Sequence, residues 1–404
     1  MSMDAESPDD FAAIVTTANG QLSMAFGRET RLGHVVRISE DGRRNVLLRC
    51  RDLSGKSPAS FIIKKVVADA YNSRDAQSWD TQRFFTDWAG AEFLSRTLSA
   101  RQTPRFYGGD GELGFFILED LGEHRSLVEP LLEEDAGSAG IALTSFSRCL
   151  GAVHAGTIGR VDEYAQILHA RNPHGGVVPQ TLTEFAERVQ RLRPQFDRLG
   201  IRDGAEYAQE VETVISAINR PGPFFSYIHG DPCPDNVFWK GGALRLIDFE
   251  FGGFGHALTD AAYGRMLFPS CWCANRLPSD LIRRMETAYR AELVTACPEA
   301  EEDRVFEDAL AHACAFWLLS TLAGQLAKVV EEDRPWGIST VRQRVLGRLD
   351  AFITTSEEFR RLPALRAMAA RLQKRLVQEW PETVPMPTYP SFNARASSPG
   401  EGTH

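Results

Sequence analysis

Acidic and amide side chains gather within one short stretch, residues 227–250, which reads YIHGDPCPDNVFWKGGALRLIDFE. Asp231 follows a His-Gly pair, Asn236 follows at the spacing D-x-x-x-x-N, and Asp248 ends the apolar run LRLID. The apolar runs predict strands joined by a turn at residues 240–242, Lys-Gly-Gly, because glycine adopts positive φ at little cost. Such a hairpin would bring Asp248 back toward Asn236.

These three side chains suit the transfer of a phosphoryl group from a nucleotide to a hydroxyl. Mg²⁺ prefers carboxylate and amide oxygens, so Asn236 and Asp248 could share a magnesium ion. The acceptor hydroxyl needs a carboxylate that takes its proton, and Asp231 is the candidate for that role. Taken singly, each residue fits a turn or a cap as well as it fits a catalytic site. The interpretation therefore depends on their order and spacing together.

The elements around this cluster divide the chain into a β-rich part and a helical part. Strand-like runs occupy residues 34–39, 45–51, 61–67, 105–107 and 114–118, and an apolar face with spacings of three and four predicts a helix over 84–98. From residue 127 onward helical patterns dominate, with candidates at 142–155, 181–194, 204–219, 280–294, 302–330, 340–353 and 356–379. The polar cluster interrupts the helical part.

The motif HGDPCPDN followed by LIDFE resembles the catalytic and metal loops of the aminoglycoside phosphotransferase and choline kinase superfamily, which are small-molecule relatives of the protein kinases. The resemblance covers roughly residues 26–265. It implies an α+β, bilobal protein-kinase-like fold with a small β-rich N-lobe and a larger, mostly helical C-lobe. It also implies ATP as donor, Mg²⁺ held by Asn236 and Asp248, and Asp231 as the catalytic carboxylate.

The same resemblance implies where the nucleotide binds in the N-lobe. Lys64, at the end of the run FIIK, would hold the donor phosphates. Lys65 remains an alternative, because neighbouring side chains on a strand point to opposite faces. Glu92, on the predicted helix, would be the ion-pair partner of the lysine. The stretch FFILEDLG resembles the last strand and the hinge, so backbone groups of Glu119 and Leu121 would meet the adenine ring.

Two further features of the resemblance concern the loops. His229 and Asp260 are expected to support the catalytic loop and not to touch the substrate. A clear glycine-rich phosphate loop is absent from FGRETRLGHVVRI, so the residues that cover the phosphates stay unassigned. Cys233 stands where protein kinases often carry lysine, which argues against a protein substrate.

We expect four parts along the chain: an N-terminal segment at 1–25, a nucleotide-binding N-lobe at 26–121, a helical C-lobe with the substrate pocket at 122–380, and a disordered tail at 381–404. The tail is rich in Pro, Ser and Gly, a composition typical of disorder. The longest apolar stretch, 309–322, contains a histidine and is too short to span a bilayer, which predicts a buried helix.

Composition limits the partners. The formal net charge of −9 disfavours a nucleic-acid or anionic-membrane binder, because phosphate-rich partners favour a basic surface. The seven cysteines are odd in number and irregular in spacing, without a C-x-x-C pair, which predicts reduced thiols in a cytoplasmic protein. We therefore expect a nucleotide and a small-molecule acceptor as partners, and leave the oligomeric state open.

The expected function is an ATP- and Mg²⁺-dependent transfer of the γ-phosphate to a hydroxyl of an aminoglycoside-like compound, a sugar or an amino alcohol. A choline- or ethanolamine-type kinase and a nucleotide-binding pseudokinase without turnover are the alternatives. The pseudokinase is disfavoured because Lys64, Asp231, Asn236 and Asp248 are all present. A metal-dependent phosphoesterase is weaker still, because its dinuclear site needs several His ligands and few lie near this stretch.

Overall fold

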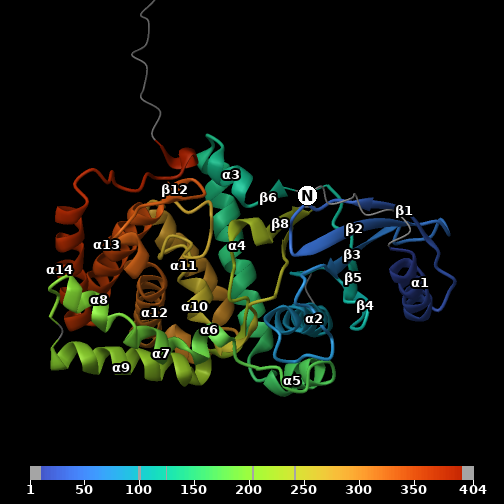
Figure 1. Ribbon diagram of the computed structural model, residues 1–404, viewed down its shortest axis with the longest axis horizontal. Coiled ribbons are helices and arrows are strands. Elements are labelled where there is room, and N and C mark those ends of the chain that lie inside the picture. The colour runs from blue at the N-terminus through green and yellow to red at the C-terminus, as the bar shows by residue number, and fades with distance from the viewer. Residues whose placement is uncertain (1–10, 99–101, 124, 203, 241–242, 394–404) are drawn as a thin grey trace, which may run out of the picture.

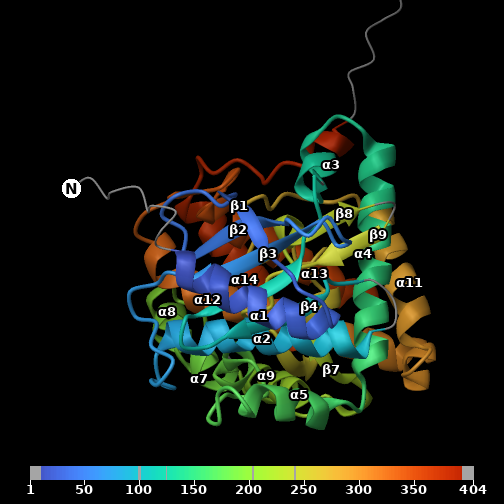
Figure 2. The same cartoon turned by 90° about the vertical axis from the view of Figure 1, so that its right-hand side faces the viewer.

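The computed structural model describes residues 11–393 except 99–101, 124, 203 and 241–242. The chain forms two lobes, with the N-terminal sheet and its helices at one end and the helical part at the other (Figure 1). Figure 2 views the molecule from the N-lobe side, with α1 in front and the helical lobe behind. The predicted bilobal α+β fold is confirmed.

The N-lobe is a five-stranded antiparallel sheet in the order β1-β2-β3-β5-β4. Its strands are β1 (Leu32–Arg37), β2 (Asn45–Asp52), β3 (Ser60–Val66), β4 (Phe106–Asp110) and β5 (Phe115–Glu119), and its helices are α1 (Ala12–Phe26) and α2 (Trp79–Thr97). Buried residues alternate with partly exposed ones along β2 and most of β3, as expected for strands whose two faces meet different surroundings.

The two helices cover different faces of the sheet, and this decides which lysine reaches the site. Phe115 and Ile117 of β5 pack in one cluster with α1, whereas Phe116 packs in the main core with α2. Lys64 lies directly opposite Phe116 in the antiparallel register, so its side chain shares the face of α2. Lys65 points to the other face, and its ammonium donates to the carbonyl of Val66.

The helical lobe contains most of the remaining elements. Its helices are α3 (Val128–Leu132), α4 (Ala136–Thr157), α5 (Val161–His169), α6 (Gln180–Thr183), α7 (Phe185–Gln190), α8 (Arg193–Arg198), α9 (Ala205–Asn219), α10 (Leu258–Ala261), α11 (Ser279–Leu293), α12 (Asp303–Val329), α13 (Val341–Phe359) and α14 (Pro363–Glu379). α12 lies at the centre, in contact with α7, α9, α10 and α13. It is apolar and long enough to cross a membrane by length and composition, but 61% of its most apolar window is buried inside the protein. This burial fits the predicted core helix.

Small sheets carry the loops of the polar cluster. β7 (Phe225–Ile228) pairs with β10 (Gly253–His256), and β6 (Arg125–Ser126) pairs with the hairpin of β8 (Val237–Lys240) and β9 (Ala243–Leu246). A last small pair joins β11 (Pro335–Trp336) to β12 (Ser339–Thr340). The predicted hairpin is confirmed, whereas the two glycines of its turn lie outside the described residues.

Two expectations about elements were wrong in detail. The single helix expected over 181–194 is three short helices, α6 to α8. The boundary between the last two long helices lies at 360–362 and not near 354, because Arg360 and Leu362 adopt positive φ and Pro363 begins α14.

The part of the expected disordered tail that the structure describes, residues 381–393, packs on the helical lobe. Met386 and Tyr389 are buried, and Thr388 forms a parallel β-bridge with Arg276. The apolar side chains among the prolines explain the difference, because they bury area that a purely polar tail lacks. The remaining prediction of disorder, for 394–404, lies outside the described residues.

Candidate functional site

The loop between β7 and β8 holds Asp231, and its backbone is fixed by one buried carboxylate. Gly230 has φ of +76°, and a Cβ there would lie 2.1 Å from the carbonyl oxygen of Phe251, so only glycine fits. The N–H groups of His229 and Gly230 donate to the two oxygens of Asp260, at 2.6 and 3.1 Å. Both Asp260 and His229 are buried. These contacts match the supporting role expected for Asp260.

Asn236 and Asp248 lie on either side of the hairpin and are brought together with the Asp231 loop. The amide nitrogen of Asn236 donates to the carbonyl of Asp231 at 3.1 Å, and the Ile247 N–H donates to the carbonyl of Asn236 at 3.1 Å. Because the amide nitrogen is used in this way, the side-chain oxygen of Asn236 is the atom left for a cation. Asp248 has φ of +69°, an uncommon conformation for a non-glycine residue that is often found at functional sites.

The donor set of Asn236 and Asp248 fits magnesium carried by a nucleotide better than a metal held by protein alone. Among the described residues, no group of three or more His, Cys, Asp or Glu is arranged to hold a metal ion. Mg²⁺ is commonly bound by one or two protein oxygens together with substrate phosphates and water. An amide oxygen next to one carboxylate matches that pattern.

Lys64 reaches the site but pairs with a carboxylate that the sequence reading did not name. Its ammonium lies 2.8 Å from Asp248 Oδ1 and 2.6 Å from Asp87 Oδ2. Burial opposes the charged lysine, but the two carboxylates outweigh it and raise the pKa of Lys64. The other oxygen of Asp87 accepts the N–H of Phe249 at 2.8 Å. Asp87 therefore holds both the lysine and the backbone next to Asp248.

The expected Lys64–Glu92 ion pair is wrong. Glu92 is buried, but it pairs with Arg171 at 2.7 Å and Arg96 at 2.5 Å, and it accepts the indole N–H of Trp88. The physical reason is helix geometry, since residues five apart on α2 point in different directions. Glu92 instead ties α2 to the segment that follows α5 in the helical lobe.

A sequence signal for Asp87 existed, although no motif contains it. Asp87 lies three residues after Phe84 and four before Ala91, on the apolar face of the predicted helix. An acid on a buried face needs a partner. Gly90 lies on the same side of α2, where a Cβ would lie 2.1 Å from the Tyr227 hydroxyl and 2.7 Å from the Phe249 Cβ. This close approach brings Asp87 to the loop of Asp248.

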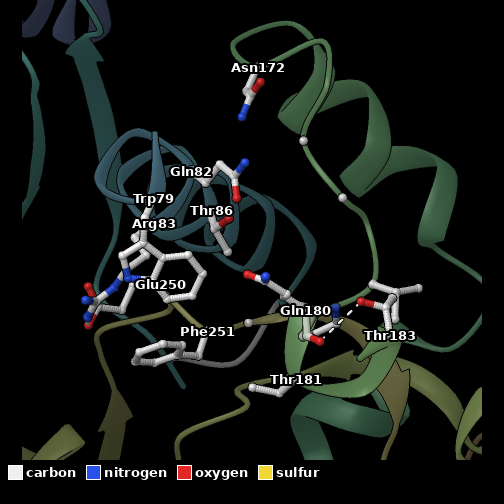
Figure 3. A pocket seen from close by; sticks show the side chains of 15 residues that line it. Trp79, Gln82, Arg83, Thr86, Asn172, Gln180, Thr181, Thr183, Glu250 and Phe251 are labelled. Carbon is white, nitrogen blue, oxygen red and sulfur yellow. Dashed lines mark hydrogen bonds and ion pairs between the residues drawn. The ribbon is translucent and has the colours of Figure 1, made fainter. Parts of the chain in front are cut away.

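Glu250 replaces the glycine that follows the metal aspartate in protein kinases, and it links both lobes. Its carboxylate forms ion pairs with Arg44, the residue before β2, and with Arg83 of α2. Figure 3 shows this carboxylate beside Arg83, with Trp79 and Phe251 next to them. A cavity of about 260 Å³ lies here, lined by α2, residues 172–183 and residues 250–252. The residues that line this cavity do not include Asp231, Asn236 or Asp248. We therefore do not assign the cavity to the phosphoryl transfer.

The hinge residues lie where the resemblance implied. Glu119 is the last residue of β5, and its N–H donates to the carbonyl of Arg105 at 2.8 Å. Leu121 follows in the connection to the helical lobe and is buried. The assignment of their backbone groups to adenine stays a prediction.

Asp231 also contacts a loop that sequence reasoning missed, residues 269–272. The Ser270 hydroxyl donates to Asp231 Oδ1, and the Tyr263 hydroxyl donates to the carbonyl of Gly230 at 3.1 Å. Burial raises the pKa of Asp231, and the hydrogen bond from Ser270 opposes that rise. The contacts to the Asp231 carboxylate involve Oδ1, which leaves Oδ2 for an acceptor hydroxyl.

The expectation that all the cysteines are free thiols was wrong. Cys233, two residues after Asp231, forms a disulfide with Cys271, whereas the other five cysteines are free and buried. The bridge joins the catalytic loop directly to the loop that carries Ser270. The sequence held no spacing pattern that indicated this pair, because the two cysteines are 38 residues apart.

Comparison with known proteins bears on the family. Residues 91–291 match the phosphotransferase enzyme family. The predicted superfamily resemblance is therefore confirmed, and the match covers the catalytic loop, the metal loop and the start of the helical lobe. The match begins after Lys64 and Asp87, so the pairing of these two residues rests on geometry alone.

Relatives and solved structures resemble the chain at low identity. The methylthioribose kinase of Citrobacter koseri is 26% identical over 282 residues, which cover 64% of this chain and 65% of that kinase. The methylthioribose kinase of Klebsiella pneumoniae is 25% identical over 59% of this chain and 61% of its own length. The chain thus matches less than two thirds of the length of these relatives. The ethanolamine kinase of Plasmodium vivax is 13% identical, with a TM-score of 0.47, 91% of this chain covered and 98% of its own.

Proposed function

We propose that this phosphotransferase-family protein transfers the γ-phosphate of ATP, with Mg²⁺, to a hydroxyl of a small molecule. The single observation that carries the proposal is the grouping of Lys64, Asn236 and Asp248 beside the Asp231 loop. Asp231, Asn236 and Asp248 lie within the region that matches the family. The two relatives described above are methylthioribose kinases by name, which supports a small hydroxyl compound as acceptor.

The roles follow from the chemistry of each group. Lys64 carries the positive charge that the donor phosphates need. Asn236 and Asp248 would hold the magnesium ion, which neutralises charge on the transferred phosphoryl group when it is bound. The bond between the acceptor oxygen and the γ-phosphorus forms while the bond from that phosphorus to the β–γ bridging oxygen breaks. The hydroxyl proton goes to Asp231, and ADP leaves.

Three features of the site suit these roles. The pKa of Asp231, which burial raises, makes it a better proton acceptor than an exposed aspartate. Asp248 keeps a lowered pKa, because Lys64 outweighs the cost of burial. Glu250 and its two arginines hold the N-lobe against the loop of Asp248. Backbone groups of Glu119 and Leu121 are proposed to contact adenine.

We also propose the nucleotide-binding N-lobe as residues 26–121 and the helical lobe with the substrate pocket as residues 122–380. The partners are then the nucleotide and the small acceptor, without nucleic acid or membrane, in the cytoplasm. The net charge of −9 supports the absence of a nucleic-acid partner.

The test is ADP release with MgATP across a panel of sugars, amino alcohols and aminoglycosides. Acceptor-dependent ADP release, together with a phosphorylated product in the mass spectrum, is the expected result. Tight binding of MgATP without turnover on any acceptor would show a nucleotide-binding pseudokinase and overturn the proposal.

A further inference from the structure

Two arginines with very little exposure hold the loop of residues 269–272 from behind. Arg348 of α13 donates to the carbonyl of Pro269 at 2.6 Å, and Arg344 donates to the carbonyls of Cys271 at 2.6 Å and Trp272 at 2.8 Å. Their exposed fractions are 1% and 0%. Within the described ranges, neither guanidinium forms an ion pair with a carboxylate. A buried guanidinium is costly unless it is hydrogen-bonded. Because the loop carbonyls are hydrogen-bond partners of both arginines, these contacts hold the loop in position.

The loop brings one side chain to each of two carboxylates on the catalytic loop. Ser270 donates to Asp231, as described above, and the indole N–H of Trp272 donates to Asp235 Oδ2 at 2.9 Å. Asp235 lies in the short 3₁₀-helix Pro234–Asn236, one residue before Asn236. The disulfide between Cys233 and Cys271 ties the two segments together. The carboxylates of Asp231 and Asp235, both on the loop between β7 and β8, therefore lie beside the same loop, residues 269–272.

The second oxygen of Asp235 lacks the partner that a buried carboxylate oxygen needs. Asp235 Oδ1 is buried and has no hydrogen-bond donor among the described residues. No Lys or Arg of the described chain forms an ion pair with Asp235 either. Buried polar atoms are almost always satisfied, so an exception beside a catalytic carboxylate points to a donor on the ligand. The indole of Trp272 is 40% exposed and offers an apolar surface next to it.

We propose that Asp235 and Trp272 form the acceptor subsite, and that the acceptor is a polyhydroxy compound with two neighbouring hydroxyl groups. One hydroxyl donates to Asp231 Oδ2 and becomes phosphorylated. The neighbouring hydroxyl donates to Asp235 Oδ1, and the carbon skeleton lies against the Trp272 ring. This subsite rests on the proposed function, since it needs Asp231 to be the proton acceptor.

A quaternary ammonium acceptor fits the same residues less well. Recognition of quaternary ammonium groups favours a cage of several aromatic rings. The aromatic contribution identified beside Asp235 among the described residues is Trp272, whose indole N–H donates to it. The N–H of Trp272 already satisfies one oxygen of Asp235, so one acceptor atom remains. A single neutral O–H matches one acceptor atom.

The experiment compares wild type, Asp235→Ala and Asp235→Asn by initial rates of ADP release at saturating MgATP. The probes are methylthioribose, D-ribose, 2-deoxy-D-ribose, xylitol, choline and ethanolamine. For the polyol with the highest wild-type rate, Asp235→Ala should raise the acceptor KM about tenfold or more, because a hydrogen bond to a charged group is lost. Asp235→Asn should raise it less, because its amide oxygen still accepts. The KM for ATP should stay unchanged.

The deoxy sugar provides a matched test of the individual contact. If D-ribose is used, its KM should rise in Asp235→Ala, whereas that of 2-deoxy-D-ribose should already be high in wild type and change little. Asp280→Asn, an exposed acid paired with Arg284, serves as the control variant with unchanged kinetics. Melting temperatures show that each variant is folded.

The possible outcomes distinguish a wrong acceptor subsite from a wrong proposed function. Polyol phosphorylation with an unchanged KM in Asp235→Ala overturns the subsite and leaves the proposed function standing. Turnover of choline or ethanolamine, but of no polyol, overturns the polyhydroxy class. Absence of turnover on a broad acceptor panel overturns the proposed function and the subsite with it.

Discussion

Replacing Asp87 by Asn removes the negative charge that pairs with Lys64 but keeps an oxygen for the N–H of Phe249. The ion pair is 2.6 Å long, and the exposed fractions of its side chains are 11% and 5%. Removing one partner of a buried pair costs about 3–5 kcal/mol when the other charge is left alone. Lys64 keeps Asp248 as a partner, so we expect the smaller value of a charged hydrogen bond, about 1.5–3 kcal/mol.

This loss should show in nucleotide use, because Lys64 is then held by one carboxylate in place of two. At 1.4 kcal/mol per factor of ten, kcat/KM for ATP should fall about 10- to 100-fold. The assay is the initial rate of ADP release at varied MgATP and fixed acceptor. Retained melting temperature, within a few degrees, would separate this effect from unfolding.

Glu92→Gln is the matched control, since Glu92 is the carboxylate that the family resemblance had suggested. It should weaken the contacts to Arg171 and Arg96 and lower the melting temperature, but leave kcat/KM for ATP within about twofold, because it does not touch Lys64. If Glu92→Gln impairs nucleotide use and Asp87→Asn does not, the assignment of the lysine partner is refuted.

Three further predictions concern the metal, the pH dependence and the stability of the helical lobe. Asn236→Ala should weaken binding of Mn²⁺ in the presence of a non-hydrolysable ATP analogue, measured by water proton relaxation, and unchanged relaxation would remove Asn236 from the metal site. Burial raises the pKa of Asp87 to about 6, and the pKa of Asp231 is raised as well. Both must be ionised, so kcat/KM should fall as pH drops below about 6, and a flat profile down to pH 5 would contradict these roles. Arg265→Met leaves two glutamates without their buried partner and should cost about 3–5 kcal/mol in the free energy of unfolding, whereas the exposed Arg284→Met should cost less than about 1 kcal/mol; equal losses would contradict the account.

The sequence predicted that Asp231, Asn236 and Asp248 lie close together, because the pattern that places them is local. His229 to Asn236 and the run that ends at Asp248 lie on two consecutive loops of one hairpin, so spacing alone brings them together. The order of a β-rich lobe followed by a helical lobe was predicted for a similar reason. Buried and exposed residues alternate along β2 and β3, and apolar residues recur at helical spacing in α2, and both patterns are local.

The remaining features depend on contacts between distant segments, which no local pattern encodes. Asp87 meets Lys64 because α2 lies on the same sheet face as that lysine. The place of Asp87 on the apolar face of α2 indicates that it is buried, but which cation it meets depends on the sheet. Ser270 and Trp272 reach the catalytic loop because α13, more than 70 residues later, holds their loop through Arg344 and Arg348. Because of this distance in sequence, no local pattern predicted that Ser270 and Trp272 lie beside the catalytic loop.

The most direct test of the central claim is single-turnover transfer of labelled γ-phosphate by Asp231→Asn with enzyme in excess over ATP. The substitution keeps the shape of the side chain and the hydrogen bond from Ser270, but removes the proton acceptor. We predict that transfer to the acceptor slows about 100-fold or more, while binding of the ATP analogue stays within about threefold of wild type. Transfer at the wild-type rate would contradict the account, because the acceptor proton would then have another destination.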